Sequence, residues 1–367
     1  MKIICSREEL QKGVNIVSKA VPTRTTMAIL ECILIDASKN DIKLMANDTE
    51  LGIETTIEGN IEERGIIALD AKIFSEIVRK LPEGEVTIIT EANFKTKITC
   101  GTANFDIIGK SGEDFSYIPV IPRNEPLNIS MITLKDVIRQ TIFSIAPNDN
   151  NKILTGELFE IEGNSLKVVS LDGHRVSMRV IELKEAYPEN KKIVVPGKTL
   201  LDVSKIIQGD SEDEVSIYIT SNHIIFEFEK TTVVSRLLDG EFLSIEQMLS
   251  KDYSTKIKIN RMNLLNCIDR ASLMANEGDK KPIIIDVKDE NLELKISSFI
   301  GSMNESIDIT KEGKDITIAF NPKFLIDALK VIDDEEITIY MINPKAPCYI
   351  KNDKESYLYL ILPVNYV

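Results

Sequence analysis

Residues 1–21, MKIICSREELQKGVNIVSKAV, carry the pattern that decides the fold: a short alternating strand, a capping residue and an amphipathic helix. The pattern returns in residues 127–147, LNISMITLKDVIRQTIFSIAP, and in residues 255–275, TKIKINRMNLLNCIDRASLMA. We expect each helix to be capped by a side chain that accepts a hydrogen bond from its first turn. The expected caps lie 127 residues apart both times: Ser6, Thr133 and Asn260. This threefold repeat predicts three domains rather than one large core.

A second strand and helix recur halfway along each copy. The segments are IALDAKIFSEIVRKLPEGEVTI (67–88), IVVPGKTLLDVSKIIQGDSEDEVSIYI (193–219) and IAFNPKFLIDALKVIDDEEITIYM (318–341). The residues expected at the turns before these helices are Asp70, Pro196 and Asn321. Alternating runs between the helices, with turns at 38–41 and 163–164, predict β-hairpins.

We therefore predict an α+β fold of three repeated domains, each a doubled β-α-β-β-β unit. The expected domains are residues 1–126, 127–253 and 254–367. Helices this short and one-sided must lie on a sheet, so we expect antiparallel sheets to cover a helical layer.

The composition excludes several classes of protein. No apolar stretch approaches the length of a membrane helix and the N-terminus does not resemble a signal peptide, so we expect a soluble, cytoplasmic protein. The five cysteines are scattered and never form a CxxC pair, which predicts free thiols and argues against a disulfide framework or a zinc site.

Positive charge concentrates on the predicted helices although the whole chain has a net charge of −14. The six helical segments together carry 14 Lys and Arg residues against 7 Asp and Glu residues: 7–20, 71–80, 134–146, 197–207, 261–275 and 322–331. In each second helix two basic residues fall seven positions apart, about two turns, and therefore share one face. These faces suit DNA phosphates, bound without regard to base sequence. The alternative is the ordinary solvated face of an amphipathic helix.

The whole chain resembles the bacterial sliding clamps, the beta subunit of the replicative DNA polymerase III. The similarity rests on GELFEIEG (156–163), VVSLDGHR (168–175), DGEF (239–242), NPKF (321–324) and LPV (362–364). It implies the DNA clamp fold, in which two molecules close head to tail into a ring with helices lining the hole and sheets outside. We therefore expect a homodimeric processivity factor that encircles and slides on double-stranded DNA, without catalysis, metal or cofactor.

The resemblance implies three sets of site residues. An apolar cleft that captures short peptide motifs from the polymerase, the clamp loader and repair proteins would be formed by Leu154, Leu171, Gly173, His174, Arg175, Val176, Leu243, Met248, Asn321, Phe324, Pro347, Leu360, Leu362, Pro363 and Val364. Arg24 and Lys152 match positions where the family touches DNA. With the helix cations described above, they give the expected DNA-facing set: Arg24, Lys72, Arg79, Lys80, Lys152, Lys198, Lys205, Lys323 and Lys330. The dimer interface would join an edge strand to a helix through Phe105, Ile107, Leu273 and Met274. Taken singly, the apolar members could equally be ordinary core residues.

The sequence departs from the family pattern at a few positions. Ser116 and Leu243 follow phenylalanines where the family usually has proline, and Leu171 replaces a common threonine or serine. The C-terminal residues Asn365, Tyr366 and Val367 replace a basic tail. These changes bear on the peptide preference of the cleft.

Two other functions are alternatives. An enzyme finds little support, since His174 and His223 form no metal-binding spacing and the Gly109-Lys110-Ser111 segment has Asn104 where a P-loop needs glycine. The second alternative is a three-domain scaffold that does not encircle DNA; the charge on the helices argues against it.

Overall fold

The computed structural model describes residues 1–116, 118–119, 121–147, 150–209, 212–249, 252–274 and 281–365. The chain divides into two compact units. The first comprises Met1–Ile132 and Asp202–Leu237, and the second comprises Thr133–Leu201 and Leu238–Val367. Each unit thus combines one terminal repeat with part of the middle repeat.

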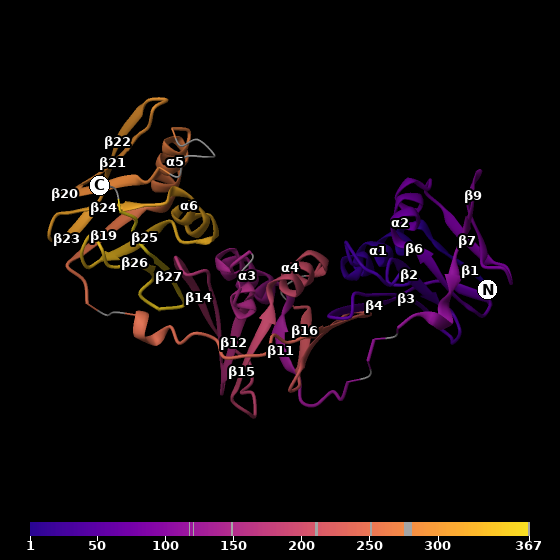
Figure 1. Ribbon diagram of the computed structural model, residues 1–367. Coiled ribbons are helices and arrows are strands. Elements are labelled where there is room, and N and C mark those ends of the chain that lie inside the picture. Colours follow the sequence, from indigo (N-terminus) through magenta and orange to yellow (C-terminus); the bar gives the residue numbers. More distant parts are fainter. Residues whose placement is uncertain are drawn as a thin grey trace. The chain divides into compact units, whose positions relative to one another are not determined.

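The first unit contains the helices α1 (Arg7–Val17) and α2 (Ala71–Lys80), which lie side by side (Figure 1). Its strands are β1 (Lys2–Ser6), β2 (Cys32–Asp36), β3 (Ile42–Asn47), β4 (Leu51–Ile57), β5 (Asn60–Glu63), β6 (Ile66–Asp70), β7 (Glu85–Thr90), β8 (Lys95–Cys100), β9 (Ala103–Ile108), β10 (Lys110–Ser111), β11 (Leu127–Ser130), β16 (Glu214–Ile219), β17 (His223–Phe228) and β18 (Thr231–Arg236). They form two antiparallel sheets, in the orders β5-β1-β7-β8-β9 and β10-β6-β2-β3-β4-β18-β17-β16-β11.

The second unit contains α5 (Arg261–Ser272) and α6 (Pro322–Val331), while α3 (Met131–Thr141) and α4 (Gly197–Ile206) each cross the boundary between the units. Its strands are β12 (Gly156–Glu162), β13 (Ser165–Leu171), β14 (Arg175–Glu182), β15 (Lys191–Pro196), β19 (Thr255–Asn260), β20 (Ile283–Lys288), β21 (Asn291–Ser297), β22 (Ser302–Asp308), β23 (Thr310–Gly313), β24 (Ile316–Phe320), β25 (Glu336–Met341), β26 (Cys348–Lys351) and β27 (Tyr357–Ile361). The sheets are antiparallel, in the orders β15-β12-β13-β14-β27-β26-β25-β19-β23 and β22-β21-β20-β24.

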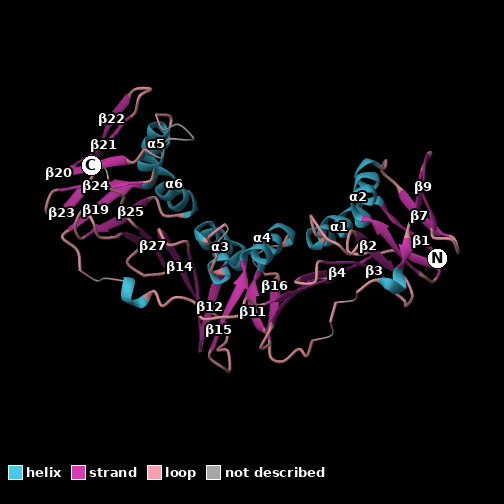
Figure 2. Ribbon diagram, viewed as in Figure 1, coloured by secondary structure: helices cyan, strands magenta, loops and turns pink. Residues whose placement is uncertain are grey.

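The element order confirms the predicted α+β fold of doubled units. The first repeat reads β1-α1-β2-β3-β4 and then β6-α2-β7-β8-β9, with short additional strands beside them. The middle repeat reads β11-α3-β12-β13-β14 and β15-α4-β16-β17-β18, and the third reads β19-α5-β20-β21-β22 and β24-α6-β25-β26-β27. Figure 2 shows how helices and strands separate into layers within each unit.

The prediction of Thr133 as a helix cap was wrong. The side chains of Ser6 and Asn260 accept hydrogen bonds from helical N–H groups as expected, but α3 already begins at Met131. Ser130, which directly precedes Met131, is an equally suitable capping residue type and ends the strand β11. The equal spacing of 127 residues therefore does not hold. The helix predicted over 261–275 ends at Ser272, and residue 275 lies outside the described residues.

Strand pairing carries each long sheet from one repeat into the next. Residues 51–55 of β4 pair with residues 231–235 of β18, and residues 175–179 of β14 pair with residues 357–361 of β27. We call each of these two strand pairings a joint. At both joints the last strand in the first half of one repeat pairs with the last strand in the second half of the next repeat. The corresponding strands β9 and β22 stand at the edges of their sheets.

Gly13 allows α1 to lie close to the sheet beneath it. A Cβ atom at this position would lie 2.5 Å from Ile57 Cγ2 and 2.7 Å from Leu44 Cδ1, both in buried side chains of the sheet. Such distances are shorter than van der Waals contact, so any larger residue must push the helix away or distort the core.

Replacing Gly13 with alanine should therefore destabilise the protein despite the higher helix propensity of alanine. We expect Gly13→Ala to lower the free energy of unfolding by about 1–2 kcal/mol, which amounts to a few degrees in Tm. Thermal unfolding measures this, with Asn15→Ala on the exposed face of α1 as the control. A Gly13→Ala protein as stable as the Asn15→Ala protein would contradict the close packing.

Candidate functional site

An apolar cluster in the second unit gathers side chains from two repeats. Leu154, Leu171 and Val176 of the middle repeat are buried in it together with Leu360 of the third repeat, and Leu362 packs against it. The structure thus brings five of the predicted cleft residues into one cluster. The pairing of β14 with β27 explains this, because it places residues about 180 positions apart in the sequence on neighbouring strands.

The predicted cleft residues Leu243 and Met248 lie on the segment after β18 and are exposed. Their exposed fractions are 47% and 42%, whereas Ile245 between them is buried in the same apolar cluster. The hydroxyl of Tyr349, itself a cluster residue, donates to the backbone carbonyl of Met248 at 2.9 Å. The cluster therefore anchors this segment and leaves two large apolar side chains accessible to solvent.

Arg175 lies buried beside the cluster, where its guanidinium has both hydrogen-bond and aromatic partners. Its guanidinium donates to Asp172 at 3.0 Å, to Asp327 at 2.7 Å and to the backbone carbonyl of Phe143. It also lies over two aromatic rings, 4.6 Å from the centroid of Phe324 and 5.3 Å from that of Phe143. A buried cation with these partners fixes α6 to β14, because losing it would leave the largely buried Asp172 carboxylate without its cation and would leave Asp327 with Lys323 alone.

His174 and the last described residues close one side of this region. The His174 ring stacks on Phe324 with centroids 5.9 Å apart, and its backbone carbonyl accepts from the N–H of Leu362 at 2.9 Å. The N–H of Val364 donates to the carbonyl of Ala319 at 2.9 Å. The C-terminal segment is thereby held to β14 and β24.

The remaining predicted cleft residues lie at turns and at a helix start. Gly173 has a φ of +84°, which favours glycine, in the turn before β14. Asn321 caps α6, Pro347 precedes β26 and Pro363 follows β27, the two prolines being half-buried. Tyr366 and Val367 of the C-terminal tail lie outside the described residues.

All nine predicted DNA-facing cations have exposed side chains. Several are nevertheless paired with an acid of their own helix: Arg79 with Glu76 at 2.6 Å, Lys205 with Asp202 at 3.4 Å and Lys323 with Asp327 at 2.7 Å. Of the cations outside the helices, Arg24 lies in the loop after α1 and Lys152 begins the 3₁₀ turn Lys152–Thr155. Exposed cations on helix faces can bind phosphate groups.

The four predicted interface residues lie at or next to unpaired sheet edges. Phe105 and Ile107 are half-buried on the edge strand β9. Leu273 is the residue that caps the end of α5 and is 72% exposed, while Met274 packs against the core of the third repeat.

Two exposed apolar residues beside the edge strand β22 were not predicted from the sequence. Phe299 and Ile300 form the turn between β21 and β22, where Phe299 is 79% exposed. Gly301 of the same turn lies close to the sulfur of Met274, since a Cβ there would be 3.6 Å from it. Two adjacent apolar residues in a turn between alternating strands are the signal that could have revealed them.

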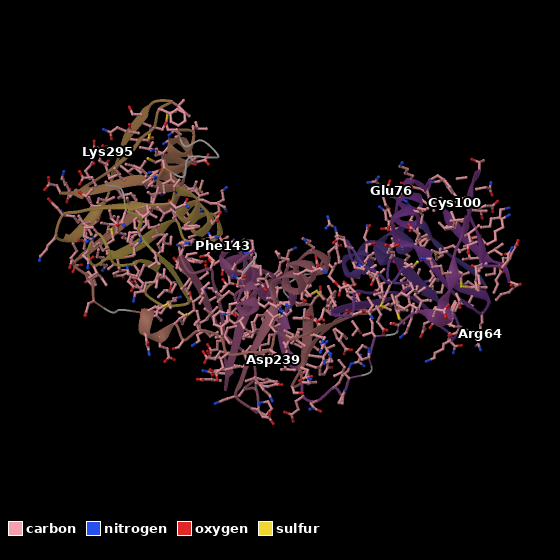
Figure 3. All side chains as sticks on the ribbon, in the orientation of Figure 1. Arg64, Glu76, Cys100, Phe143, Asp239 and Lys295 are labelled. Carbon is pink, nitrogen blue, oxygen red and sulfur yellow. The ribbon has the colours of Figure 1, made fainter. Side chains whose placement is uncertain are left out.

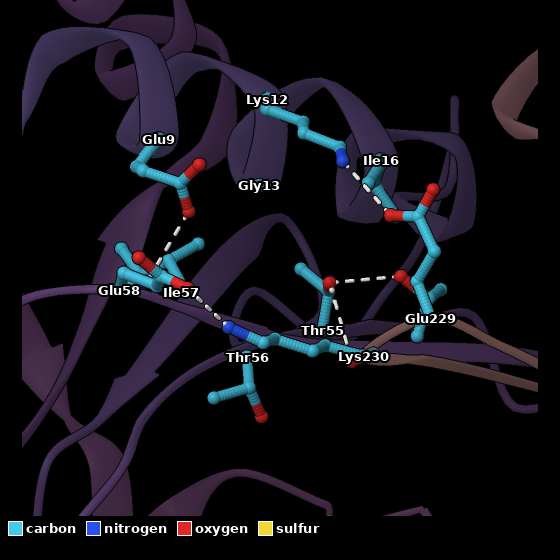
Figure 4. Close-up of a pocket in the computed structure, with 11 residues that line it drawn as sticks. Glu9, Lys12, Gly13, Ile16, Thr55, Thr56, Ile57, Glu58, Glu229 and Lys230 are labelled. Carbon is cyan, nitrogen blue, oxygen red and sulfur yellow. Dashed lines mark hydrogen bonds and ion pairs between the residues drawn. The ribbon is translucent and has the colours of Figure 1, made fainter. Parts of the chain in front are cut away.

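A pocket of about 420 Å³ lies between α1, β4 and the turn between β17 and β18 in the first unit (Figure 4). Lys12 pairs with Glu229 at 2.8 Å, and Lys230 pairs with Glu58 at 2.7 Å. The backbone N–H of Glu58 donates to the carboxylate of Glu9. The two ion pairs attach the β17–β18 turn to α1 and β4. Because both lysines already have a carboxylate partner, the pocket offers no strong site for a charged ligand.

Three family models match successive parts of the chain. They describe the N-terminal, central and C-terminal domains of the DNA polymerase III beta subunit and match residues 1–119, 128–243 and 246–365.

The chain belongs to the DNA polymerase III beta subunit family, the bacterial sliding clamps. It is similar to the beta sliding clamp of Staphylococcus epidermidis, with 32% identity over 375 residues that cover 99% of each chain. Among solved structures it is similar to a putative DNA polymerase III beta subunit from Eubacterium rectale, with 70% identity and a TM-score of 0.97, and to the sliding clamp of Bacillus subtilis, with 33% identity and a TM-score of 0.96. Both alignments cover 100% of each chain.

Membership of the sliding clamp family agrees with the fold and the function predicted from the sequence. The fold is the three-domain α+β clamp fold with antiparallel sheets and, in the described part of the chain, six α-helices. The function is that of a DNA polymerase processivity factor, a polymerase subunit without catalysis.

The described residues form neither a metal site nor a membrane-spanning helix. Within the described residues no group of three or more His, Cys, Asp or Glu side chains could hold a metal ion. No described helix has the length and apolar character required to cross a membrane. All five cysteines are buried free thiols.

Glu157 is a buried acid in the middle repeat of this sliding clamp. Its side chain is fully buried on β12, and neither carboxylate oxygen has a hydrogen-bond partner within the described structure. Burial raises the pKa of Glu157 to about 8 and outweighs a smaller lowering by the neighbouring Thr141 hydroxyl, whose own proton goes to the carbonyl of Val137 at 2.7 Å. Glu157 is therefore largely protonated in the folded protein at neutral pH.

The raised pKa of Glu157 predicts a stability that falls with rising pH. The unfolded chain releases this proton near the ordinary value of 4.5 and the folded protein near 8, so the folded state binds more protons between these values. Glu157→Gln, which keeps the size and removes the charge, should raise the free energy of unfolding at pH 9 by on the order of a few kcal/mol, with a much smaller effect at pH 5. Chemical denaturation at the two pH values measures this. An equal effect at both would contradict the buried proton.

Proposed function

We propose that two copies of this chain close head to tail into a ring that encircles double-stranded DNA and slides along it in the cytoplasm. The ring would tether the polymerase and other replication and repair proteins through the apolar cleft. The single observation that carries this proposal is the strand-pairing rule at the two internal joints.

The rule predicts a third joint between two copies. Inside the chain, β4 pairs with β18 and β14 pairs with β27, in each case the last strand of a first half-repeat with the last strand of a second half-repeat. The strands left over by this rule are β22, at the end of a first half-repeat, and β9, at the end of a second. Pairing β22 of one copy with β9 of another would give the unpaired backbone groups of both edge strands hydrogen-bond partners, and two such joints would close a ring of two chains.

Apolar side chains beside these edges support the joint. Phe105 and Ile107 on β9 would pack against Leu273 and Met274 after α5, and Phe299 in the neighbouring turn would extend the contact. Exposed apolar groups of this size favour association when they are removed from water together.

Exposed helix cations support a DNA partner. The pairs seven residues apart on α2, α4 and α6 place positive charge on one face of each helix, and Arg24 and Lys152 add to it from loops. Contacts of this kind go to phosphates and carry no base specificity, which suits a ring that must move along DNA.

The apolar cluster supports peptide binding. Leu243 and Met248 are exposed on the segment whose Ile245 is buried in the cluster with Leu171 and Val176, and a peptide with two or three apolar side chains could cover them. Main-chain groups and apolar pockets are the usual means of capturing short motifs. The departures at Leu171 and Leu243 would then tune which motifs bind best.

Topological linkage tests the ring. Protein bound to linear duplex DNA at low salt, followed by circularisation of the DNA with ligase, should stay on the closed circle at high salt, because a ring cannot leave a circle even when its ionic contacts are screened. Linearising the circle should release it. Leu273→Asp, which places a charge in the joint, should abolish retention. Equal loss from circles and linear DNA by the unmodified protein would contradict encirclement and favour a scaffold that does not enclose DNA.

Matched methionine variants test the cleft. Met248→Ala should weaken the binding of a fluorescent peptide that carries the clamp-binding motif of the replicative polymerase by about tenfold, roughly 1.4 kcal/mol, because it removes an anchor side chain. Met262→Ala is the control, since Met262 has nearly the same exposure, 43% against 42%, but lies on α5. Fluorescence anisotropy gives both affinities. Equal affinities for the two variants would place the peptide elsewhere.

A further inference from the structure

The second helix of every repeat places one acid between two cations at the same spacing. The acid lies four residues after the first cation and three residues before the second. The three sets are Lys72-Glu76-Arg79, Lys198-Asp202-Lys205 and Lys323-Asp327-Lys330. The spacing puts all three side chains of a set on one helix face.

In each helix the central acid engages one flanking cation. The Glu76 carboxylate lies 2.6 Å from Arg79 and 3.8 Å from Lys80. Asp202 lies 3.4 Å from Lys205, and Asp327 lies 2.7 Å from Lys323. A DNA phosphate that approaches one of these cations must therefore compete with a carboxylate that already holds it.

Helix stability alone gives a weak reason for this arrangement. Exposed pairs three or four residues apart contribute only about 0.3–0.5 kcal/mol. This range applies to the pair of Glu76, whereas the side chains of Asp202 and Asp327 are only 12% and 19% exposed. The acids also lie at the sixth position of their helices, beyond the first turn where the helix dipole favours negative charge. Asp327 has a second function, since it also binds the buried Arg175. Glu76, labelled in Figure 3, has a side chain that is 48% exposed, and its ion pairs within the described part of the chain are with Arg79 and Lys80 of its own helix.

We propose that Glu76, Asp202 and Asp327 act as internal counter-ions that weaken the hold of the helix cations on DNA phosphates. This inference rests on the proposed DNA-facing role of these helices. When a phosphate comes within reach, the cation leaves its carboxylate and pairs with the phosphate. When the DNA moves on, the ion pair between the cation and the carboxylate forms again. The cation is compensated at every step, so its free energy changes little as the DNA slides past.

A pair of matched charge variants tests the proposal. Glu76→Gln removes the counter-ion on α2. Glu62→Gln removes the same charge from a pair with the same separation, since Glu62 lies 2.6 Å from Lys2 and has a side chain that is 41% exposed, but it lies on the strand β5. Both side chains keep their size, and circular dichroism with thermal unfolding establishes that both full-length variants fold.

The measurement is the affinity for a short linear duplex of random sequence as a function of salt concentration. Each additional phosphate contact steepens the slope of log K against log salt by about 0.9. Glu76→Gln should therefore steepen the slope by about one unit for each subunit that touches the DNA, and should strengthen binding in low salt by roughly threefold to tenfold. Glu62→Gln should behave as the unmodified protein does.

The outcomes separate this inference from the proposed function. If the unmodified protein shows no salt-dependent affinity, the DNA-facing role itself is overturned. If it does, and Glu76→Gln matches the unmodified protein or changes no more than Glu62→Gln, the counter-ion role is overturned while the DNA-facing role stands. A steeper slope for Glu76→Gln alone supports the inference.

Discussion

Backbone hydrogen bonds across the borders between repeats are the interaction on which the rest of this structure depends. An antiparallel sheet exposes unpaired N–H and C=O groups at its edge, and burying or pairing them avoids a large free-energy cost. Here the pairing of β4 with β18 and of β14 with β27 turns short sheets of single repeats into two nine-stranded sheets. The position of each terminal repeat against its half of the middle repeat is thus set by main-chain geometry, which tolerates wide variation in side chains.

The candidate peptide cleft is a consequence of one of these joints. Arg175 begins β14 and pairs with Ile361 at the start of the contact with β27, so the turn that carries His174 lies beside the C-terminal segment. Arg175 then reaches Asp327 on α6 and fixes that helix to the same place. Apolar residues from both repeats are buried at this joint, while Leu243 and Met248 are exposed. A binding surface built on paired strands and a buried ion pair is rigid before any partner arrives.

The sequence sufficed for the features that depend on local chemistry. Capping residues and helical spacing predicted the helices, and Gly163-Asn164 predicted a hairpin turn that the structure contains between β12 and β13. The cap at Thr133 failed because Ser130, three residues earlier, satisfies the same local rule. The joints could not be derived from patterns, because the register between residues 175–179 and 357–361 is set by the whole fold. The ion pairs of Arg175 and the orphaned carboxyl group of Glu157 depend on the same distant contacts, and the cleft residues were found only through the family resemblance.

We propose that the pairing rule inside the chain also operates between two copies. Amide hydrogen exchange tests it most directly, because β9 and β22 are edge strands whose outer N–H groups pair with no other strand of the described structure. We expect these amides to be protected at a concentration where the dimer is complete and to lose their protection on dilution to the monomer, while the amides at the β4–β18 joint remain protected throughout. Exchange of the β9 and β22 amides at the rate of free sheet edges in the dimer would contradict it.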